Sequence, residues 1–433
     1  MALCPNDIGI GAFQIMSDAS ANVGWAVFRI RDYSIFFVCR LLSGMAYMMN
    51  DVALGWLVYD RTHSPLALGM VGLTIFAPNI LLVLVVGQVA ERVDRRAILI
   101  CSFALMSLSS ACLAFVSESS IAAIWPIFML VALNSVARAF ANPASQAIVP
   151  TLVPREMFST AVAISSSAYQ TAIIAGPAIG GIAYIWGPGF VFSLTSLAFG
   201  VASLSMVLMQ TRARQTPLAG PDAQGRTGFA ARWHILTAGF RFIAGRPLVL
   251  GTISLDLFAV LLGGATALLP IYAADILHTG PMGLGTLRSM PAIGAFTMSI
   301  VLTHFPMNSK TGFRMFGAVG IFGAFTIVFG LSTSFWLSIP ALIIMGCADM
   351  VSVYIRNTLV QMETPDDMRG RVSAVNTLFV GASNQLGEFE SGVVASLIGP
   401  VGAVVAGGVG TLLIVALWMR FFPELRDRDK LVA

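Results

Sequence analysis

Between two long apolar runs lies the stretch Gly87-Gln88-Val89-Ala90-Glu91-Arg92-Val93-Asp94-Arg95-Arg96, which carries five charges in its last six residues. Charged residues make up only 11% of the chain, so a cluster of this density is unusual in it. Such a cluster cannot lie in the hydrocarbon of a bilayer, because removing the charges from water costs too much free energy. We therefore expect this stretch to be a loop at a membrane surface.

The composition of the whole chain fits this interpretation. Hydrophobic residues make up 57% of its 433 residues, and the mean hydropathy is +0.84. A soluble domain of this length would need many more charged residues to cover its surface. Apolar runs recur along the whole chain, and a membrane-spanning helix needs ~20 apolar residues. The sequence therefore predicts a helical protein that crosses the bilayer many times.

Twelve apolar runs are long enough to be membrane spans. They cover residues 34–58, 67–88, 97–117, 121–142, 158–185, 189–209, 248–273, 281–303, 312–333, 336–357, 372–396 and 400–421. We expect an all-α membrane fold of twelve helices in two pseudo-symmetric six-helix bundles. The start of the chain carries acids and small polar groups rather than a basic stub before an apolar core, so we expect no cleaved signal peptide.

Basic residues are concentrated in every second connection between the spans. These connections hold Arg29 and Arg31, the Arg92/Arg95/Arg96 cluster, Arg155, six arginines within 211–246, Lys310 and Arg314, Arg369 and Arg371, and the tail from Arg420 onward. By the positive-inside rule, these connections and both termini face the cytoplasm. We expect a multi-pass protein of a bacterial-type inner membrane, whose net charge of +4 reflects topology and not nucleic-acid binding.

The longest polar stretch between spans divides the chain into two halves. We expect an N-terminal six-helix half at 1–210, a cytoplasmic linker with an amphipathic segment at 211–247, and a C-terminal half with a short tail at 248–433. Two weak repeats support a duplication. Phe28-Arg29 recurs as Phe240-Arg241 after 212 positions (240 − 28), and Pro154 of Pro154-Arg155-Glu156-Met157 recurs as Pro365 of Pro365-Asp366-Asp367-Met368 after 211 (365 − 154). Duplicated halves place a substrate path between them, near the midplane.

Several classes of function are not supported by any motif. No Gly-x-x-x-x-Gly-Lys-Ser/Thr stretch occurs, so the chain is not expected to be an ATPase. No Ser/His/Asp or Cys/His constellation indicates an enzyme. The five cysteines and four histidines show neither disulfide nor metal-ligand spacing. We expect no cofactor and no metal.

Four further segments carry a family resemblance. They are Ala175-Gly176-Pro177-Ala178-Ile179-Gly180-Gly181, Asn50-Asp51-Val52-Ala53-Leu54-Gly55-Trp56-Leu57-Val58-Tyr59, Arg369-Gly370-Arg371-Val372-Ser373-Ala374-Val375-Asn376 and Gly387-Glu388-Phe389-Glu390-Ser391-Gly392. With the charged loop, they resemble the major facilitator superfamily, and within it the branch of enterobactin-type siderophore exporters and macrolide-type drug exporters. The resemblance implies a secondary transporter that works by alternating access, with spans one, four, seven and ten around a central cavity.

The resemblance also implies roles for particular residues. The charged loop and two helix-end arginines are gate candidates on the cytoplasmic side: Gly87, Glu91, Arg92, Asp94, Arg95, Arg96, Arg138 and Arg356. Interfacial anchoring or pairing with a loop is the alternative for the last two, which are expected near the cytoplasmic ends of their spans. The family pattern has Asp in place of Glu91 and Gly in place of Asp94. Its Arg-x-x-x-Gly motif is not clear at Arg138, so a proton-relay role is not transferred.

The Gly-Pro element of the fifth span, with Gly176, Pro177, Gly180 and Gly181, is typical of exporters in the superfamily. Its glycines permit close helix approach, and its proline bends the helix. Simple packing is the alternative interpretation, because both residue types are common in membrane helices.

Charged residues within spans are candidates for function, because burying them costs several kcal/mol unless they are paired or hydrated. Asp51, Asp256 and Asp349 lie on three of the spans implied to line the cavity, and we expect proton coupling at one or more of them. Structural ion pairs with Arg40, Arg138 or Arg288 are the alternative. Further coupling candidates are Glu388 and Glu390, and the substrate-cavity candidates are Arg40, Asn50, Asn134 and Arg288.

Glu388 and Glu390 are two positions apart, so on a helix they point about 200° away from each other. We therefore expect at most one of them to face the cavity. Arg288 lies on the outer side of its span, where it holds an anionic substrate or anchors the helix at the interface.

The function predicted from these features is proton-coupled efflux of a small organic molecule, a siderophore or drug-like compound, by a monomer in the lipid bilayer. The expected partners are the small-molecule substrate, protons and lipid, without nucleic acid. A lysophospholipid or lipid transporter is one alternative. A membrane sensor or assembly partner that no longer transports is an alternative of another class.

Overall fold

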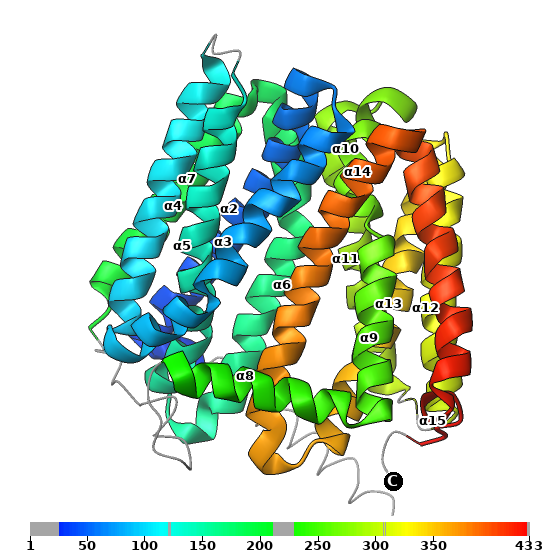
Figure 1. Cartoon of the computed structure of the whole chain (residues 1–433). Coiled ribbons are helices and arrows are strands. Elements are labelled where there is room, and N and C mark those ends of the chain that lie inside the picture. The colour runs from blue at the N-terminus through cyan, green and yellow to red at the C-terminus, as the bar shows by residue number, and fades with distance from the viewer. Residues whose placement is uncertain (1–25, 120–122, 211–228, 306, 308, 431–433) are drawn as a thin grey trace, which may run out of the picture.

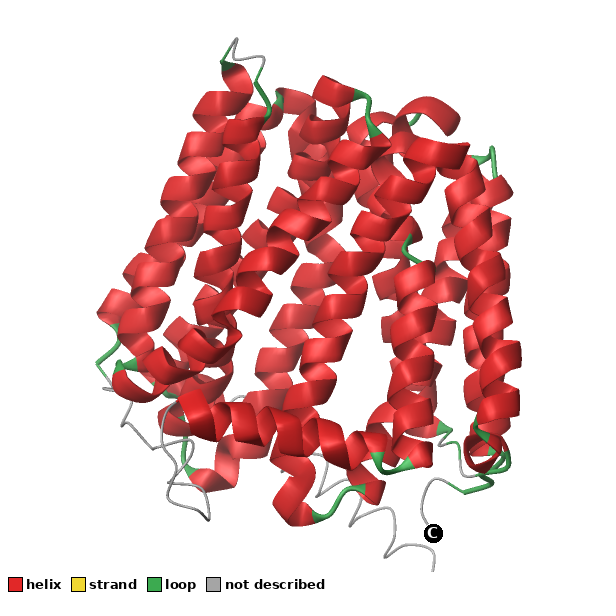
Figure 2. Ribbon diagram, in the orientation of Figure 1, coloured by secondary structure: helices red, strands yellow, loops and turns green. Residues whose placement is uncertain are grey.

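The computed structural model of the chain describes residues 26–119, 123–210, 229–305, 307 and 309–430, without the side chains of 84, 88, 90–92 and 229–236. Within these residues the ordered elements are helices, and no strand occurs among them (Figure 2). This agrees with the all-α fold predicted from the sequence.

The first set of long helices comprises α2 (Arg31–Thr62), α3 (Pro65–Arg92), α4 (Arg95–Glu118), α5 (Trp125–Leu152), α6 (Phe158–Ala183) and α7 (Pro188–Leu208). Three single turns accompany them: η1 (Val27–Arg29), η2 (Arg155–Met157) and η3 (Tyr184–Trp186). Helix α8 (Phe229–Ala244) then runs across one end of the bundle (Figure 1). We call this the linker end, and the opposite end the loop end.

The second set begins with α9 (Pro247–Leu262), which continues through the short turns η4 (Ala265–Leu268), α10 (Leu269–Ile271) and η5 (Tyr272–Ile276). It goes on with α11 (Gly280–His304), α12 (Thr311–Leu331), α13 (Phe335–Glu363), α14 (Asp366–Phe421) and the terminal turn α15 (Pro423–Arg426).

Helix α14 is two helices joined by a sharp corner. Gly399 has φ 81° and ψ 162°, a conformation that glycine adopts without a Cβ clash, and Pro400 follows at the start of the second arm. The chain rises along the first arm and returns along the second (Figure 1). The corner therefore lies where the sequence predicts the connection between the last two spans.

Ten helices in the described residues are long and apolar enough to cross a membrane. They include α14 as a single helix and omit α11, which has 25 residues. The expected count of twelve follows only if α11 also spans and the arms of α14 are separate spans, so it stays a prediction.

The fourth predicted span, 121–142, is wrong at its second end, because α5 runs ten residues further, to Leu152 (152 − 142). Pro143 and Pro150 lie inside this helix. Membrane helices tolerate proline where neighbouring groups bond the freed carbonyls. Pro150 frees the carbonyl of Gln146, and the next carbonyl, that of Ala147, accepts a 2.6 Å hydrogen bond from Arg95 Nη1 of α4.

The helix contacts form two groups. In the first group, α4 packs on α5 and α7, α2 packs on α6 and α7, and α3 packs on α5. In the second group, α11 and α12 pack on α13, and α9 and α12 pack on α14. Across the groups, α3 packs on α14, and α6 on α11. We keep the predicted six-helix halves as a proposal, which these contacts support.

The buried core shows where the two groups meet. One apolar cluster at the loop end draws residues from both, among them Leu57 and Leu113 from the first and Leu269 and Leu342 from the second. Toward the linker end, each apolar cluster in the described residues belongs to one group alone. Among the described residues, the groups therefore share a buried apolar core at the loop end and not toward the linker end.

Glycines make this close approach possible. A Cβ on Gly181 of α6 would lie 2.6 Å from the Pro281 carbonyl and 3.0 Å from Gly285 Cα on α11. A Cβ on Gly69 of α3 would lie 2.9 Å from the Phe389 carbonyl on α14. Small residues let membrane helices pack backbone to backbone.

Candidate functional site

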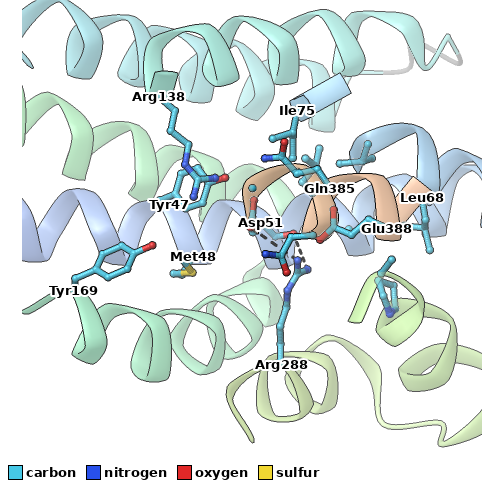
Figure 3. A pocket seen from close by; sticks show the side chains of 17 residues that line it. Tyr47, Met48, Asp51, Leu68, Ile75, Arg138, Tyr169, Arg288, Gln385 and Glu388 are labelled. Atoms are coloured by element: carbon cyan, nitrogen blue, oxygen red, sulfur yellow. Dashed lines mark hydrogen bonds and ion pairs between the residues drawn. The ribbon is translucent and has the colours of Figure 1, made fainter. Parts of the chain in front are cut away.

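A cavity of about 440 Å³ lies between the two groups of helices, inside the predicted membrane region (Figure 3). We call it the main chamber. Its walls come from α2, α3, α5 and α6 on one side and from the α9–α10 connection, α11 and α14 on the other. Its charged lining residues are Asp51, Arg138, Arg288 and Glu388.

Helical periodicity explains which side chains reach this chamber. On α2 the lining residues are Tyr47, Met48, Asp51, Leu54 and Gly55, which are spaced by one, three or four positions. Residues at this spacing share one face of an α-helix. On α14 the same spacing brings Gly381, Asn384, Gln385 and Glu388 to the chamber.

Two of the predicted residues meet directly. Arg288 Nη2 lies 3.9 Å from Asp51 Oδ2, and Arg288 Nη1 donates to the Asp51 main-chain carbonyl at 3.3 Å. This pair joins α11 to α2, across the two groups of helices. Of the two roles predicted for Arg288, its position in the chamber favours the substrate cavity over anchoring at the interface.

Glu388 extends from α14 toward the same pair (Figure 3). Its carboxylate also lies against α3, because a Cβ on Gly72 would be 3.0 Å from Glu388 Oε2. Glu390 is not among the lining residues of the chamber. The two glutamates thus diverge as their separation along the helix predicts.

Arg138 also lines the main chamber, and its expected position near a helix end is wrong. Because α5 continues to Leu152, Arg138 lies 14 residues before that end (152 − 138). Its guanidinium carbon stands 3.4 Å from the ring centroid of Tyr47. The residue therefore lines the cavity, beside Tyr47 (Figure 3).

A smaller cavity of about 40 Å³, the side chamber, adjoins the main one. Tyr47, Arg138 and Tyr169 line both chambers, and Arg40 lines the smaller one. The guanidinium carbon of Arg40 lies 5.1 Å from the ring centroid of Tyr169. Arg40 Nε is buried and has no hydrogen-bond partner. Arg40, which is predicted for the cavity, thus lies in the side chamber and not in the main one.

The two asparagines predicted for the cavity, Asn50 and Asn134, line neither chamber. Asn50 is buried, and its Oδ1 accepts a 3.5 Å hydrogen bond from Thr195 Oγ1 on α7. It precedes Asp51 by one position, which rotates it about 100° away from the chamber. Asn134 is buried in α5, and its Nδ2 has no partner.

Asp256 and Arg356 form a buried ion pair between α9 and α13. Neither residue lines a chamber, and the partner of Asp256 differs from the arginines considered as alternatives. Asp349 lies two turns before Arg356 on α13, also outside both chambers. In the described residues its carboxylate makes no ion pair or hydrogen bond.

The described part of the charged loop fastens helix ends within the first group. Asp94 caps α4 by accepting a 3.0 Å bond from the Arg96 amide. The Arg96 guanidinium donates to the carbonyls of Met206 and Val207 at the end of α7, at 2.8 and 2.7 Å. Gly87 lies within α3, and the side chains of Glu91 and Arg92 lie outside the described residues.

The Gly-Pro element lies at two helix contacts. Gly176 and Gly180 face Met48 and Met49 of α2, and Gly181 faces α11. Pro177 lies inside α6, and its carbonyl approaches Gly285. The element therefore lies where the loop-end contact between the groups is made.

Sequence reasoning missed the uncharged polar residues of the chambers, above all Tyr47, Tyr169 and Gln385. Tyr47 lies four positions before Asp51, and Gln385 three before Glu388, so each shares a helix face with a predicted charge. This spacing was the available signal. Tyr169 has no such neighbour on α6.

Comparison with known proteins supports a transporter. A family model described as transmembrane secretion effector matches residues 22–431. The enterobactin exporter EntS of Escherichia coli O1:K1 is 26% identical over 400 residues, which cover 90% of this chain and 91% of EntS. The EntS of Escherichia coli O157:H7 is 26% identical over 401 residues with the same coverage.

Solved structures share the fold at low sequence identity. The nucleoside transporter NupG aligns with a TM-score of 0.71 at 12% identity, over 90% of this chain and 100% of that one. The D-xylose-proton symporter aligns with a TM-score of 0.67 at 13% identity, over 91% and 98%. At these identities the likeness concerns the fold alone.

Proposed function

Because the chain belongs to the transmembrane secretion effector family of the major facilitator superfamily, we propose that it exports a small organic molecule in exchange for protons. Members of this superfamily are transporters and not enzymes. The direction of transport, the coupling to protons and the alternating-access cycle are the proposal.

One observation carries the proposal: Asp51, Arg288 and Glu388 gather in a chamber between two groups of helices. A low-polarity medium disfavours the charged form of a carboxyl group, so a carboxyl there can bind and release a proton as its surroundings change. Among the five candidate carboxylates, only Asp51 and Glu388 line the chamber. Asp256 is already paired with Arg356.

The shared core at the loop end supports alternating access. There, the Tyr59 hydroxyl of α2 donates to the Asp275 carboxylate of η5, which ties the groups beside the apolar cluster. Toward the linker end, the groups share no such cluster in the described residues. In a rocking motion, the two groups of helices would separate at the loop end and come together at the linker end. The chamber would then open toward the loop end.

The same proposal includes an orientation. The basic connections lie at the linker end with α8, so we place that end and both termini in the cytoplasm. The structure would then represent the state that is closed to the outside. We place the protein, as a monomer, in the bacterial inner membrane.

The similarity to EntS makes a siderophore the first substrate to test. The test uses purified protein in liposomes with a pH gradient imposed across the membrane. Where the loop end of the protein faces the acidic side, enterobactin should accumulate on that side. Collapse of the gradient by a protonophore should abolish accumulation. Enterobactin movement that is equal with and without the gradient would exclude proton coupling, and no movement of this or any drug-like compound would exclude the exporter.

A further inference from the structure

Two arginines of the cavity make no direct ion pair with a carboxylate in the described part of the chain. Neither Arg40 nor Arg138 makes an ion pair with any residue that the structure describes. Each lies against a tyrosine ring instead, Arg138 against Tyr47 and Arg40 against Tyr169. Arg40 Nε is buried without a partner. These two guanidinium groups flank the side chamber and account for all its charged lining residues.

This arrangement is costly unless something binds there. A cation within a membrane protein is stabilised mainly by a counter-ion or by water. A tyrosine ring attracts a guanidinium through its quadrupole, but more weakly than a carboxylate does. Two such groups around one small space therefore point to an anionic ligand.

The charge balance of the two chambers agrees. Together they are lined by three arginines, Arg40, Arg138 and Arg288, and by two acids, Asp51 and Glu388. With both acids ionised, the net charge is +1 (3 − 2). Asp51 pairs with Arg288, and Glu388 attracts both Arg288 and Arg138. The arginine without a facing acid is therefore Arg40, so the surplus lies toward the side chamber. A cavity with this surplus attracts anions and repels cations.

The sizes of the two chambers indicate which part of such a ligand binds in each of them. The side chamber, at about 40 Å³, has room for a few water molecules or for one acidic group. The main chamber, at about 440 Å³, adds an apolar wall that includes Met48, Leu68, Val71 and Ile75. Planar guanidinium groups bind oxyanions with two parallel hydrogen bonds.

We propose that the substrate is an amphipathic organic anion whose acidic group binds in the side chamber between Arg40 and Arg138, while its apolar body lies in the main chamber. This inference rests on the proposed function, because it names the substrate class of the same cavity. Tyr47 and Tyr169 line both chambers and can each donate a hydroxyl hydrogen bond to the oxyanion.

The test compares two fluorescent probes that differ in one charge, dansylglycine and its neutral amide dansylglycinamide. Each is titrated into the purified protein in lipid nanodiscs, without any gradient. Wild-type protein should bind the acid about ten-fold or more tighter than the amide, because hydrogen bonds to charged groups are the stronger ones. Arg40→Gln and Arg138→Gln should each lose most of this preference.

The control is Arg314→Gln, which removes the same charge from an exposed site at the start of α12. It should keep the full preference. Arg138→Lys, which keeps the charge but not the planar group, should retain part of it. Unchanged thermal midpoints of the variants would show that they are folded.

Three results would overturn the inference: equal affinity of wild-type protein for acid and amide, a preference that survives in both glutamine variants, or no binding of either probe. These results concern binding at equilibrium. They are separate from the failure of proton-driven transport in liposomes, which would overturn the proposed function and leave the anion preference standing.

Discussion

Glu388 and Glu390 are of the same residue type on the same helix, but only Glu388 lines the main chamber. If Glu388 takes part in coupling, Glu388→Gln fixes a neutral side chain there. We expect this variant to lose accumulation driven by a pH gradient while it still lets substrate equilibrate. The measurement is enterobactin flux in proteoliposomes, with and without the gradient.

Glu390→Gln is the matched control, because it makes the same chemical change outside both chambers. It should transport as the wild type does. If Glu390→Gln loses gradient-driven accumulation and Glu388→Gln keeps it, the assignment of the coupling site to the chamber is wrong.

The Asp256–Arg356 pair allows a test of whether Asp256 has a structural role or takes part in proton coupling. Removing one partner leaves a buried charge, so Asp256→Leu should lower the free energy of unfolding by about 3–5 kcal/mol. The double variant Asp256→Leu with Arg356→Met replaces the pair by apolar groups and should regain most of that stability. Thermal unfolding in detergent measures both effects.

Transport by the same double variant separates the two roles considered for Asp256. If the pair is only structural, the double variant should regain gradient-driven accumulation together with its stability. Stable double-variant protein without proton-driven transport would show instead that this pair takes part in the transport cycle.

Helices α6 and α11 meet through Gly181 and Gly285, and in the proposed cycle this contact closes the loop end. The larger side chain of Gly181→Val would clash with the Pro281 carbonyl, which lies 2.6 Å from a Cβ at that position. We expect the variant to shift the protein toward a state open at the loop end. Spin labels at Ser119 and Ser334, one on each side of that end, should report longer distances.

Gly317→Val on α12 is the control for this experiment, because no atom lies within 4 Å of a Cβ there. Its label distances should match those of the unsubstituted protein. Distances that do not change in Gly181→Val would mean that this contact does not hold the loop end closed.

The order of the helices could be predicted from the sequence, because long apolar runs and basic connections are local signals. The end of α5 could not, since Pro143 and Pro150 lie inside this helix, whereas prolines usually end a helix in water. That error placed Arg138 at a helix end.

Asp51, Arg288 and Glu388 were predicted as candidates because each is a charge within a span. Their meeting in one chamber depends on how α2, α11 and α14 turn about their axes, which only the packed structure reveals. The same rotation excludes Asn50 and Glu390 from the chamber, although each is close in sequence to a residue that lines it.

At the level of the whole molecule, the distribution of basic residues predicts an orientation in the membrane. In a variant whose native cysteines are replaced by alanine, Ser309→Cys at the linker end should be inaccessible to an impermeant maleimide in intact cells. Ser119→Cys at the loop end should be labelled. The reverse pattern would place the linker end outside and contradict export from the cytoplasm through this state.

Two helix groups share a core at one end, around a chamber with two carboxylates, and this arrangement supports the proposed proton-coupled alternating access. The most direct test measures protons and substrate together. Liposomes that hold the protein and a pH-sensitive dye receive an enterobactin gradient and no pH gradient. We predict that protons move against the direction of the substrate, and that Asp51→Asn with Glu388→Gln abolishes the proton signal. Substrate movement without any proton movement in the wild-type protein would contradict the account.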